Sequence, residues 1–181
     1  MQKFEELKFE IPKLKGISEK TIEEHLKLYS GYVKNINLTL EQGNPKIGFE
    51  FDGMRNHEYY FESLSGGAKN LEEESILKKQ IEKDFGSFEN WLTKFKDLAI
   101  TRGIGWAMLY YDPITKQLLN VWIDEHHIGQ LNGCKTIIAL DIWEHAFVAD
   151  YFPSGKKQYI EDFFENLNWE VIEKNFIDAV K

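Results

Sequence analysis

The sequence predicts an α+β fold, in which an N-terminal helical hairpin domain precedes a C-terminal domain with a three-stranded antiparallel sheet flanked by helices. Hydrophobic residues in the first hundred positions recur at helical spacing, strand-like runs separated by turn residues follow from Gly103, and helical spacing then resumes. Because helices and strands are segregated and do not alternate, the pattern does not indicate βαβ units. We place the N-terminal domain at residues 1–84 and the C-terminal domain at residues 85–181.

Four helices are expected before the sheet, at residues 18–40, 50–64, 72–85 and 87–101. Ser18 and Ser87 stand at the starts of the first and the last, where a side-chain oxygen caps free backbone N–H groups. The Gly66-Gly67 pair follows the second helix and closes it.

Three strands are expected next, at residues 105–112, 117–124 and 135–142. The first two form a hairpin around the turn sequence Pro113-Ile114-Thr115-Lys116. Helical spacing resumes at residues 143–151 and again at 157–178, with an interruption at Phe152-Pro153-Ser154-Gly155.

Composition limits the kinds of protein that fit. The chain has 181 residues, of which 43% are hydrophobic, and this suits one compact domain or two small subdomains. A net charge of -8 lacks the basic footprint of a nucleic-acid binder, and no apolar run is long enough for a membrane span. The single cysteine, Cys134, has no partner for an internal disulfide. We expect a cytoplasmic protein that binds neither nucleic acid nor membrane.

The segment Asp141-Ile142-Trp143-Glu144-His145 carries the most chemical information. On a helix, residues four apart lie on one face, so Asp141 and His145 would share a site and could share a metal ion. The alternative is structural, with the aspartate as a helix N-cap and the histidine packed on the core.

The other histidines favour the metal. His25 and His57 lie near the apolar stripes of two expected helices, where an imidazole without a partner is costly. Three imidazoles and one carboxylate suit iron, manganese or zinc, and the absence of thiolates argues against a structural zinc cluster.

These residues resemble the iron/manganese superoxide dismutases. Asp141-Ile142-Trp143-Glu144-His145-Ala146 is similar to the family's D-x-W-E-H-A signature. Further similar segments follow the family's order: Thr21-Ile22-Glu23-Glu24-His25, Tyr32-Val33-Lys34-Asn35, Asn56-His57 with Tyr60, Phe85-Gly86-Ser87-Phe88, Gly103-Ile104-Gly105-Trp106 and Asn168-Trp169-Glu170.

The resemblance implies that His25, His57, Asp141 and His145 bind one iron or manganese ion per subunit. Iron is slightly favoured because a histidine replaces the amide donor that many members have. It implies disproportionation of the superoxide anion to dioxygen and hydrogen peroxide. The alternative is a non-enzymatic metal-binding or structural member of the same fold, although all four ligands are retained. A mononuclear hydrolase or oxygenase is disfavoured because no H-E-x-x-H pattern or placed general base is present.

The resemblance also implies roles around the metal. In the family, a donor to the solvent ligand comes either from a position that is Gly53 here or from one that is His126, so we expect His126 to take the role that many members give to Gln. An imidazole there adds a group that titrates near neutral pH. The alternative for His126 and His127 is a pair of solvated loop histidines. Tyr32 resembles the gateway tyrosine.

Trp106 and Trp143 resemble the family's water-excluding aromatic wall, and Glu144 the carboxylate that reaches the last histidine ligand of the other subunit. A homodimer or higher homo-oligomer is therefore expected. The arginine that usually lines the family's entrance is missing, and Lys156 or Lys157 is a candidate to replace its charge; a solvated pair of lysines in a loop is at least as good an interpretation.

The sequence departs from the family's usual pattern at two places. His25 and Tyr32 are seven residues apart where the family has eight, which indicates that a π-type bulge is absent; otherwise Tyr29 is the gateway candidate. A His and Tyr pair that bridges the family's dimer is replaced around Leu28-Tyr29 and at Val148, which indicates a rebuilt interface or substrate entrance.

Overall fold

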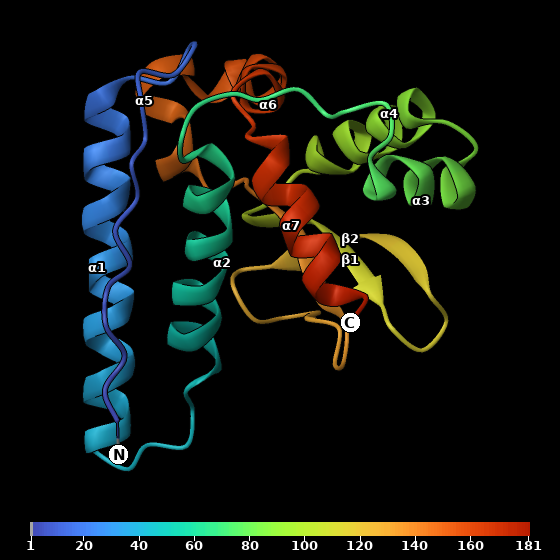
Figure 1. The fold of residues 1–181 in the computed structure, drawn as a ribbon. Coiled ribbons are helices and arrows are strands. Elements are labelled where there is room, and N and C mark those ends of the chain that lie inside the picture. The colour runs from blue at the N-terminus through green and yellow to red at the C-terminus, as the bar shows by residue number, and fades with distance from the viewer. Residues whose placement is uncertain (1) are drawn as a thin grey trace.

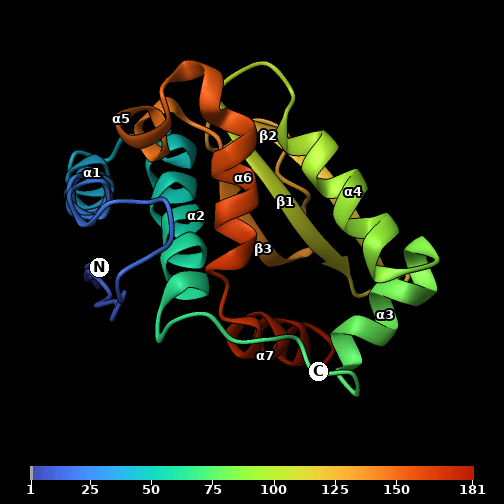
Figure 2. The same ribbon diagram turned by 90° about the horizontal axis from the view of Figure 1, so that it is seen from above.

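The computed structural model describes residues 2–181 and has the predicted α+β architecture. Helices α1 (Glu19–Glu41) and α2 (Gly48–Leu64) form an antiparallel pair that stands beside the rest of the molecule (Figure 1). Viewed from above, α1 lies at one side and α3 (Ile76–Phe85) and α4 (Phe88–Ala99) at the other, with the sheet between them (Figure 2).

The sheet has the strand order β2-β1-β3 and is antiparallel throughout. It consists of β1 (Gly105–Asp112), β2 (Gln117–Asp124) and β3 (Lys135–Asp141). Helices α2 and α7 (Trp169–Ala179) pack against β3, and α4 packs against β2. The sheet register places Trp106 directly opposite Asp141, so two of the expected site residues are neighbours across β1 and β3.

The predicted helix caps are present. The Ser18 and Ser87 side chains accept hydrogen bonds from the backbone N–H groups of Thr21 and Asn90. Helix α3 begins at Ile76, four residues later than expected, because Ser75 caps it and the acidic residues before Ser75 stay outside the helix.

Both helical segments expected after the sheet are interrupted. Residues 143–151 form a short 3-10 turn, η1 (Glu144–Ala146), and one turn of helix, α5 (Val148–Tyr151). After the 3-10 turn η2 (Pro153–Gly155), residues 157–178 divide into α6 (Lys156–Glu165) and α7. Asn168 causes the second break, because its side chain caps α7 and its backbone N–H donates to the Ser63 carbonyl of α2.

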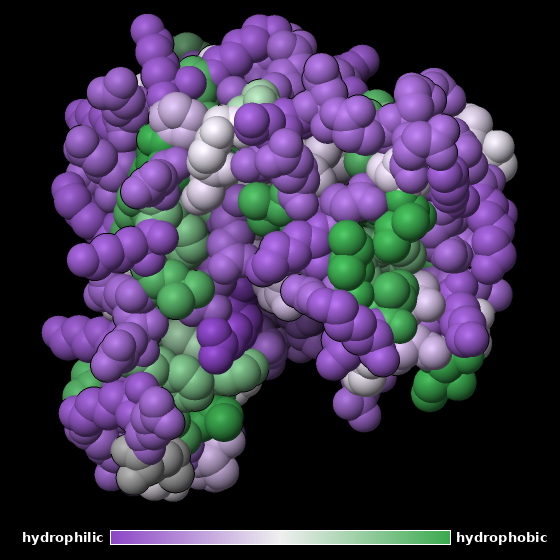
Figure 3. Space-filling view, in the orientation of Figure 1, coloured by the Kyte–Doolittle hydropathy of each residue, from purple (hydrophilic) through white to green (hydrophobic). Residues whose placement is uncertain are grey.

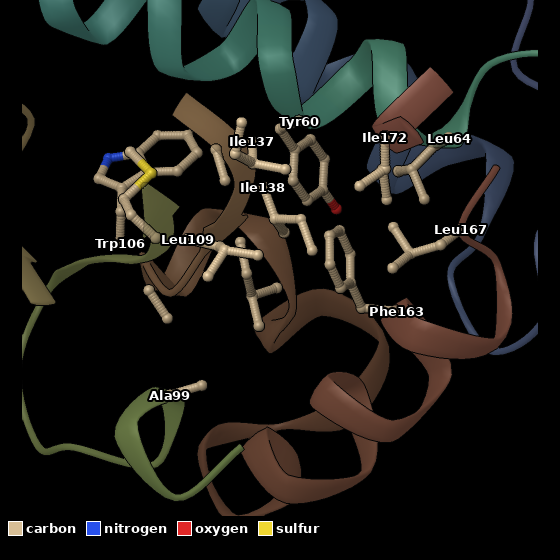
Figure 4. Close-up of a cluster of buried hydrophobic side chains, with 14 of the residues drawn as sticks. Tyr60, Leu64, Ala99, Trp106, Leu109, Ile137, Ile138, Phe163, Leu167 and Ile172 are labelled. Atoms are coloured by element: carbon tan, nitrogen blue, oxygen red, sulfur yellow. The ribbon is translucent and has the colours of Figure 1, made fainter. Parts of the chain in front are cut away.

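One hydrophobic core joins the helices to the sheet. Figure 4 shows Tyr60 projecting from α2 toward Ile138 of β3 and Phe163 of α6. Hydrophilic side chains cover most of the face in Figure 3. No helix within residues 2–181 has the length and apolar character needed to cross a membrane.

Candidate metal centre

Four side chains from separate parts of the chain meet at the junction of the helical pair and the sheet. His25 comes from α1, His57 from α2, Asp141 from the end of β3 and His145 from η1. One potential ligand atom from each lies within 4.8 Å of the others. Ligand atoms around one ion at about 2.1 Å lie roughly 3–4 Å apart, so the group has the dimensions of a mononuclear site.

Asp141 ends a strand and does not lie on a helix, so the helical-spacing argument for its meeting with His145 is wrong. The chain turns after β3, and the backbone N–H of Trp143 donates to Oδ1 of Asp141 at 2.7 Å. Oδ2 lies 3.1 Å from Nε2 of His145. The carboxylate therefore accepts a turn hydrogen bond with one oxygen and faces the histidines with the other. It is not the helix N-cap of the structural alternative, because the N-cap of η1 is Trp143.

The remaining two imidazoles face the same carboxylate oxygen. Nε2 of His25 lies 3.2 Å from Oδ2 of Asp141, and Nε2 of His57 lies 3.6 Å from it. His25, His57 and Asp141 are buried. Burial opposes ionisation of Asp141, but the charge of His145 and the hydrogen bonds of His145 and His25 hold the pKa of its carboxyl well below the usual range. Burial lowers the pKa of both His25 and His57, so both imidazoles are neutral.

His57 provides the sharpest test of whether a cation fits. Its Nδ1 donates to the carbonyl of Gly53 at 2.6 Å, so a neutral ring carries no hydrogen at Nε2. That nitrogen is buried, has no hydrogen-bond partner among the described residues, and faces the acceptor Oδ2 of Asp141. Two lone pairs that face each other in a buried site are repulsive, and a metal ion between them would satisfy both.

His126 is fully buried beside this group and bonded through both ring nitrogens. The indole N–H of Trp106 donates to Nδ1 at 3.0 Å, and Nε2 lies 2.6 Å from the hydroxyl oxygen of Tyr32. Because an indole N–H only donates, Nδ1 must be the acceptor and the hydrogen of the neutral ring lies on Nε2. His126 therefore donates to Tyr32.

The expectation that His126 titrates near neutral pH is wrong. Burial lowers its pKa from 6.5 to about 4, and the Trp106 N–H leaves no room for a hydrogen on Nδ1. The alternative of two solvated histidines fails for His126. Its neighbour His127 is partly exposed, and Nδ1 of His127 lies 3.9 Å from a carboxylate oxygen of Glu125.

Tyr32, and not Tyr29, points to the site. Helix α1 is α-helical without interruption, and seven residues of regular helix bring His25 and Tyr32 onto one face. Tyr29 instead accepts a hydrogen bond from the backbone N–H of Leu7 and donates to the carboxylate of Glu58.

Gly53 leaves the space that the Tyr32 ring occupies. A Cβ atom at Gly53 would lie 2.7 Å from Cδ1 of Tyr32. The close approach explains why this position of α2 has no side chain, and it leaves His126 as the donor next to the tyrosine.

Aromatic rings enclose the group. The ring of Trp143 stacks on those of His126 and His145, and the edge of Trp106 meets the ring of His57. Glu144 is exposed beside His145, whose side chain is 27% exposed.

Of the two lysines expected near the entrance, Lys156 has its amine bound away from the four metal-binding residues. The Lys156 amine donates to the carbonyl of Thr101 and lies over the Trp122 ring, and Lys157 is exposed.

Two residues that support the site through hydrogen bonds to its backbone were not found from the sequence. The Tyr159 hydroxyl donates to the carbonyl of Asp141 at 2.9 Å, and Gln130 donates to the carbonyl of His126 at 2.9 Å. Tyr159 lies in the expected helical segment 157–178, and nothing local indicated that it reaches β3.

Known proteins resemble this chain over most of its length. Residues 73–175 match the C-terminal domain of iron/manganese superoxide dismutases. A manganese superoxide dismutase of Halobacterium salinarum is 41% identical over 126 residues, which are 68% of this chain and 60% of that protein. The chain thus spans about 60% of the length of this relative.

Iron enzymes match more of the chain. The iron superoxide dismutase of Cupriavidus metallidurans is 32% identical over 189 residues and 93% of both proteins. That of Aquifex aeolicus is 33% identical over 190 residues, which are 93% of this chain and 88% of the relative.

Proposed function

The chain belongs to the iron/manganese superoxide dismutase family, and on this premise we propose that it disproportionates superoxide to dioxygen and hydrogen peroxide. One observation carries the proposal: three imidazoles and one buried carboxylate have ligand atoms within 4.8 Å of one another. His25, His57, Asp141 and His145 would hold one iron or manganese ion per subunit, and we favour iron.

When bound, the metal ion supplies the one-electron redox chemistry. The protein's part begins with His57, whose Nδ1–H to the Gly53 carbonyl turns its Nε2 lone pair inward. The backbone N–H of Trp143 fixes the carboxylate of Asp141 through Oδ1 and leaves Oδ2 facing the imidazoles.

Proton handling would belong to Tyr32 and His126. Because His126 donates through Nε2, the Tyr32 oxygen is an acceptor in that contact, and its own hydroxyl hydrogen is free to point into the site. Burial, followed by the charges of Asp141 and Glu50, raises the pKa of Tyr32, so the phenol keeps its proton until substrate arrives. Trp106 and Trp143 exclude bulk water from the site.

We also propose a two-fold homodimer, in which Glu144 reaches His145 of a second copy. The exposure of Glu144 and the partial exposure of His145 on one turn support this arrangement. A cytoplasmic location stays a prediction.

The test is to express the protein with iron alone and with manganese alone, then to measure metal content and superoxide removal. We expect one ion per subunit and turnover with at least one metal. Turnover no greater than that of the free metal ion, in fully loaded protein, would contradict the proposed function.

A further inference from the structure

Three tyrosines form a continuous line from the proposed metal centre to the protein surface. The Tyr60 and His25 ring centroids are 5.0 Å apart, and the hydroxyl groups of Tyr60 and Tyr159 are hydrogen-bonded at 3.3 Å. The ring of Tyr151 follows, 5.8 Å from that of Tyr159. Tyr60 and Tyr159 are fully buried, and Tyr151 is partly exposed.

The two ends of the line differ chemically. Figure 4 shows Tyr60 within the hydrophobic cluster, with its hydroxyl oxygen next to Phe163. At the outer end, Tyr151 donates its hydroxyl hydrogen to the carboxylate of Asp162 at 2.8 Å. Only the outer tyrosine of the three therefore has a carboxylate that can take its proton.

Gly16 packs directly against Tyr151 and Asp162 at the outer end of the line. Gly16 has a φ of +75°, and a Cβ atom there would collide with the Tyr151 hydroxyl and the Asp162 carboxylate. Asp162 is itself buried, accepts a hydrogen bond from Gln158 and lies 3.7 Å from the Lys15 amine. These contacts fix the acceptor against the phenol.

A tyrosyl radical persists in a protein only where its proton has an acceptor, because the cationic radical is unstable in apolar surroundings. Tyr60 and Tyr159 can therefore pass the electron on, whereas the radical comes to rest on Tyr151. Burial and the hydrogen bond to Asp162 raise the pKa of Tyr151, so the group is a neutral phenol before oxidation. Loss of an electron from Tyr151 would then move its proton across the existing hydrogen bond.

We propose that Tyr60, Tyr159 and Tyr151 carry an electron to the metal centre when hydrogen peroxide attacks it, so that oxidative damage is drawn away from the ligands. This inference rests on the proposed function, which supplies both a redox metal and the peroxide. The line is a contiguous set of contacts, and none of the proposed superoxide chemistry uses Tyr151.

The step balances as follows. One hydrogen peroxide receives one electron from the reduced metal ion and one from Tyr151, and its O–O bond breaks. The products are one water, one hydroxide, a metal ion oxidised by one electron and a neutral tyrosyl radical. The Tyr151 proton passes to Asp162, and a proton from solvent converts one of the two hydroxides into water.

The tryptophans beside the metal centre have no proton acceptor comparable to Asp162. The indole N–H of Trp106 donates to His126, and that of Trp143 donates to the carbonyl of Glu125. Neither indole has a carboxylate acceptor. Burial lowers the pKa of the His126 imidazole, and the acceptor of Trp143 is a carbonyl, so both indoles face poor proton acceptors.

The experiment treats the reduced, metal-loaded protein with hydrogen peroxide and follows it by freeze-quench electron paramagnetic resonance and peptide mass spectrometry. We expect a tyrosyl radical and oxidation of the Tyr151 peptide in the wild type. In Tyr151→Phe we expect loss of that radical, oxidation of peptides containing His25 or Tyr60, and inactivation by peroxide that is several-fold faster. Superoxide turnover before peroxide should be unchanged.

Tyr111→Phe is the matched control, because Tyr111 is also buried but packs on Phe176 away from the line. If Tyr151→Phe does not fold, the wild-type peptide map still decides, by comparing oxidation of Tyr151 with that of Tyr111.

Equal radical yield and equal inactivation in the wild type and Tyr151→Phe would overturn the inference, as would oxidation confined to Trp106 and Trp143 in both. A protein without superoxide turnover would contradict the proposed function instead. The radical needs only a bound redox metal and added peroxide, so its appearance in such a protein would still support the tyrosine line.

Discussion

The indole N–H of Trp106 donates to Nδ1 of His126 at 3.0 Å, and this contact decides which way the hydrogen bond between His126 and Tyr32 runs. With Nδ1 occupied as an acceptor, the neutral ring carries its hydrogen on Nε2 and presents it to the tyrosine. Trp106, which offers no ligand atom to the four-residue group, thus orders the proton positions beside it.

Without the Trp106 N–H, the ring hydrogen of His126 is no longer confined to Nε2, so Trp106→Phe should allow both tautomers. We expect superoxide turnover to fall about tenfold while metal content is retained, in the range typical of lost outer-sphere contacts. Nitrogen-15 shifts of the His126 ring in protein loaded with a diamagnetic divalent ion should change from a pure Nε2–H form to a mixture. Trp122→Phe, at a surface indole, is the control, and an unchanged tautomer in Trp106→Phe would contradict the argument.

Gly53→Ala tests the close approach of α2 to Tyr32. The new Cβ atom would lie 2.7 Å from the Tyr32 ring, so the ring must move away from His126. Overpacking of this kind costs about 1–3 kcal/mol of stability, and we expect turnover to fall as well. Urea unfolding and superoxide assays measure the two effects.

Gly31→Ala is the matched control on α1, because a Cβ atom there has nothing within 4 Å. We expect this substitution to stabilise the protein by roughly 0.5–1 kcal/mol, the usual gain for replacing a glycine inside a helix. Similar losses in both variants would show that the effect at Gly53 does not come from Tyr32.

His57→Ala should abolish stoichiometric metal binding, since it removes one of four donors and the only one whose inward nitrogen is fixed by a hydrogen bond to the backbone. Metal analysis after gel filtration checks this. His127→Ala removes a partly exposed histidine outside the site and should keep its metal. Full metal content in His57→Ala would exclude His57 as a ligand.

The stability of the protein should depend on pH through His126. Its pKa is lowered by burial to about 4, whereas the unfolded chain takes up a proton near the ordinary 6.5. The unfolded state therefore binds more protons in this window, and stability is lost as the pH falls from about 6.5 toward 4. Above pH 7 the contribution no longer changes.

His126→Gln cannot take up that proton, so the wild type should lose roughly 2 kcal/mol relative to the variant between pH 7.5 and pH 4.5. Urea unfolding of both proteins at the two pH values gives this difference. A difference that stays constant with pH would mean that His126 keeps an ordinary pKa in the folded state.

Much of the fold could be read from local patterns. The caps at Ser18 and Ser87, the hairpin and the third strand depend on neighbouring residues, and all are present. The breaks in the later helices depended on Asn168, whose backbone bond to Ser63 joins segments more than a hundred positions apart. Hydrophobic spacing alone does not register such a contact.

By itself, the sequence determined that His25 and His57 would lie near the apolar stripes of two helices, and the types and order of the three histidines and the aspartate indicated the family. Only the tertiary structure decided that Asp141 ends a strand, that His126 is neutral with its hydrogen on Nε2, and that Tyr60, Tyr159 and Tyr151 lie in one line. The physical reason is that ligand identity is a property of single residues. Protonation, hydrogen-bond direction and electron paths instead depend on burial and on partners brought together by distant segments.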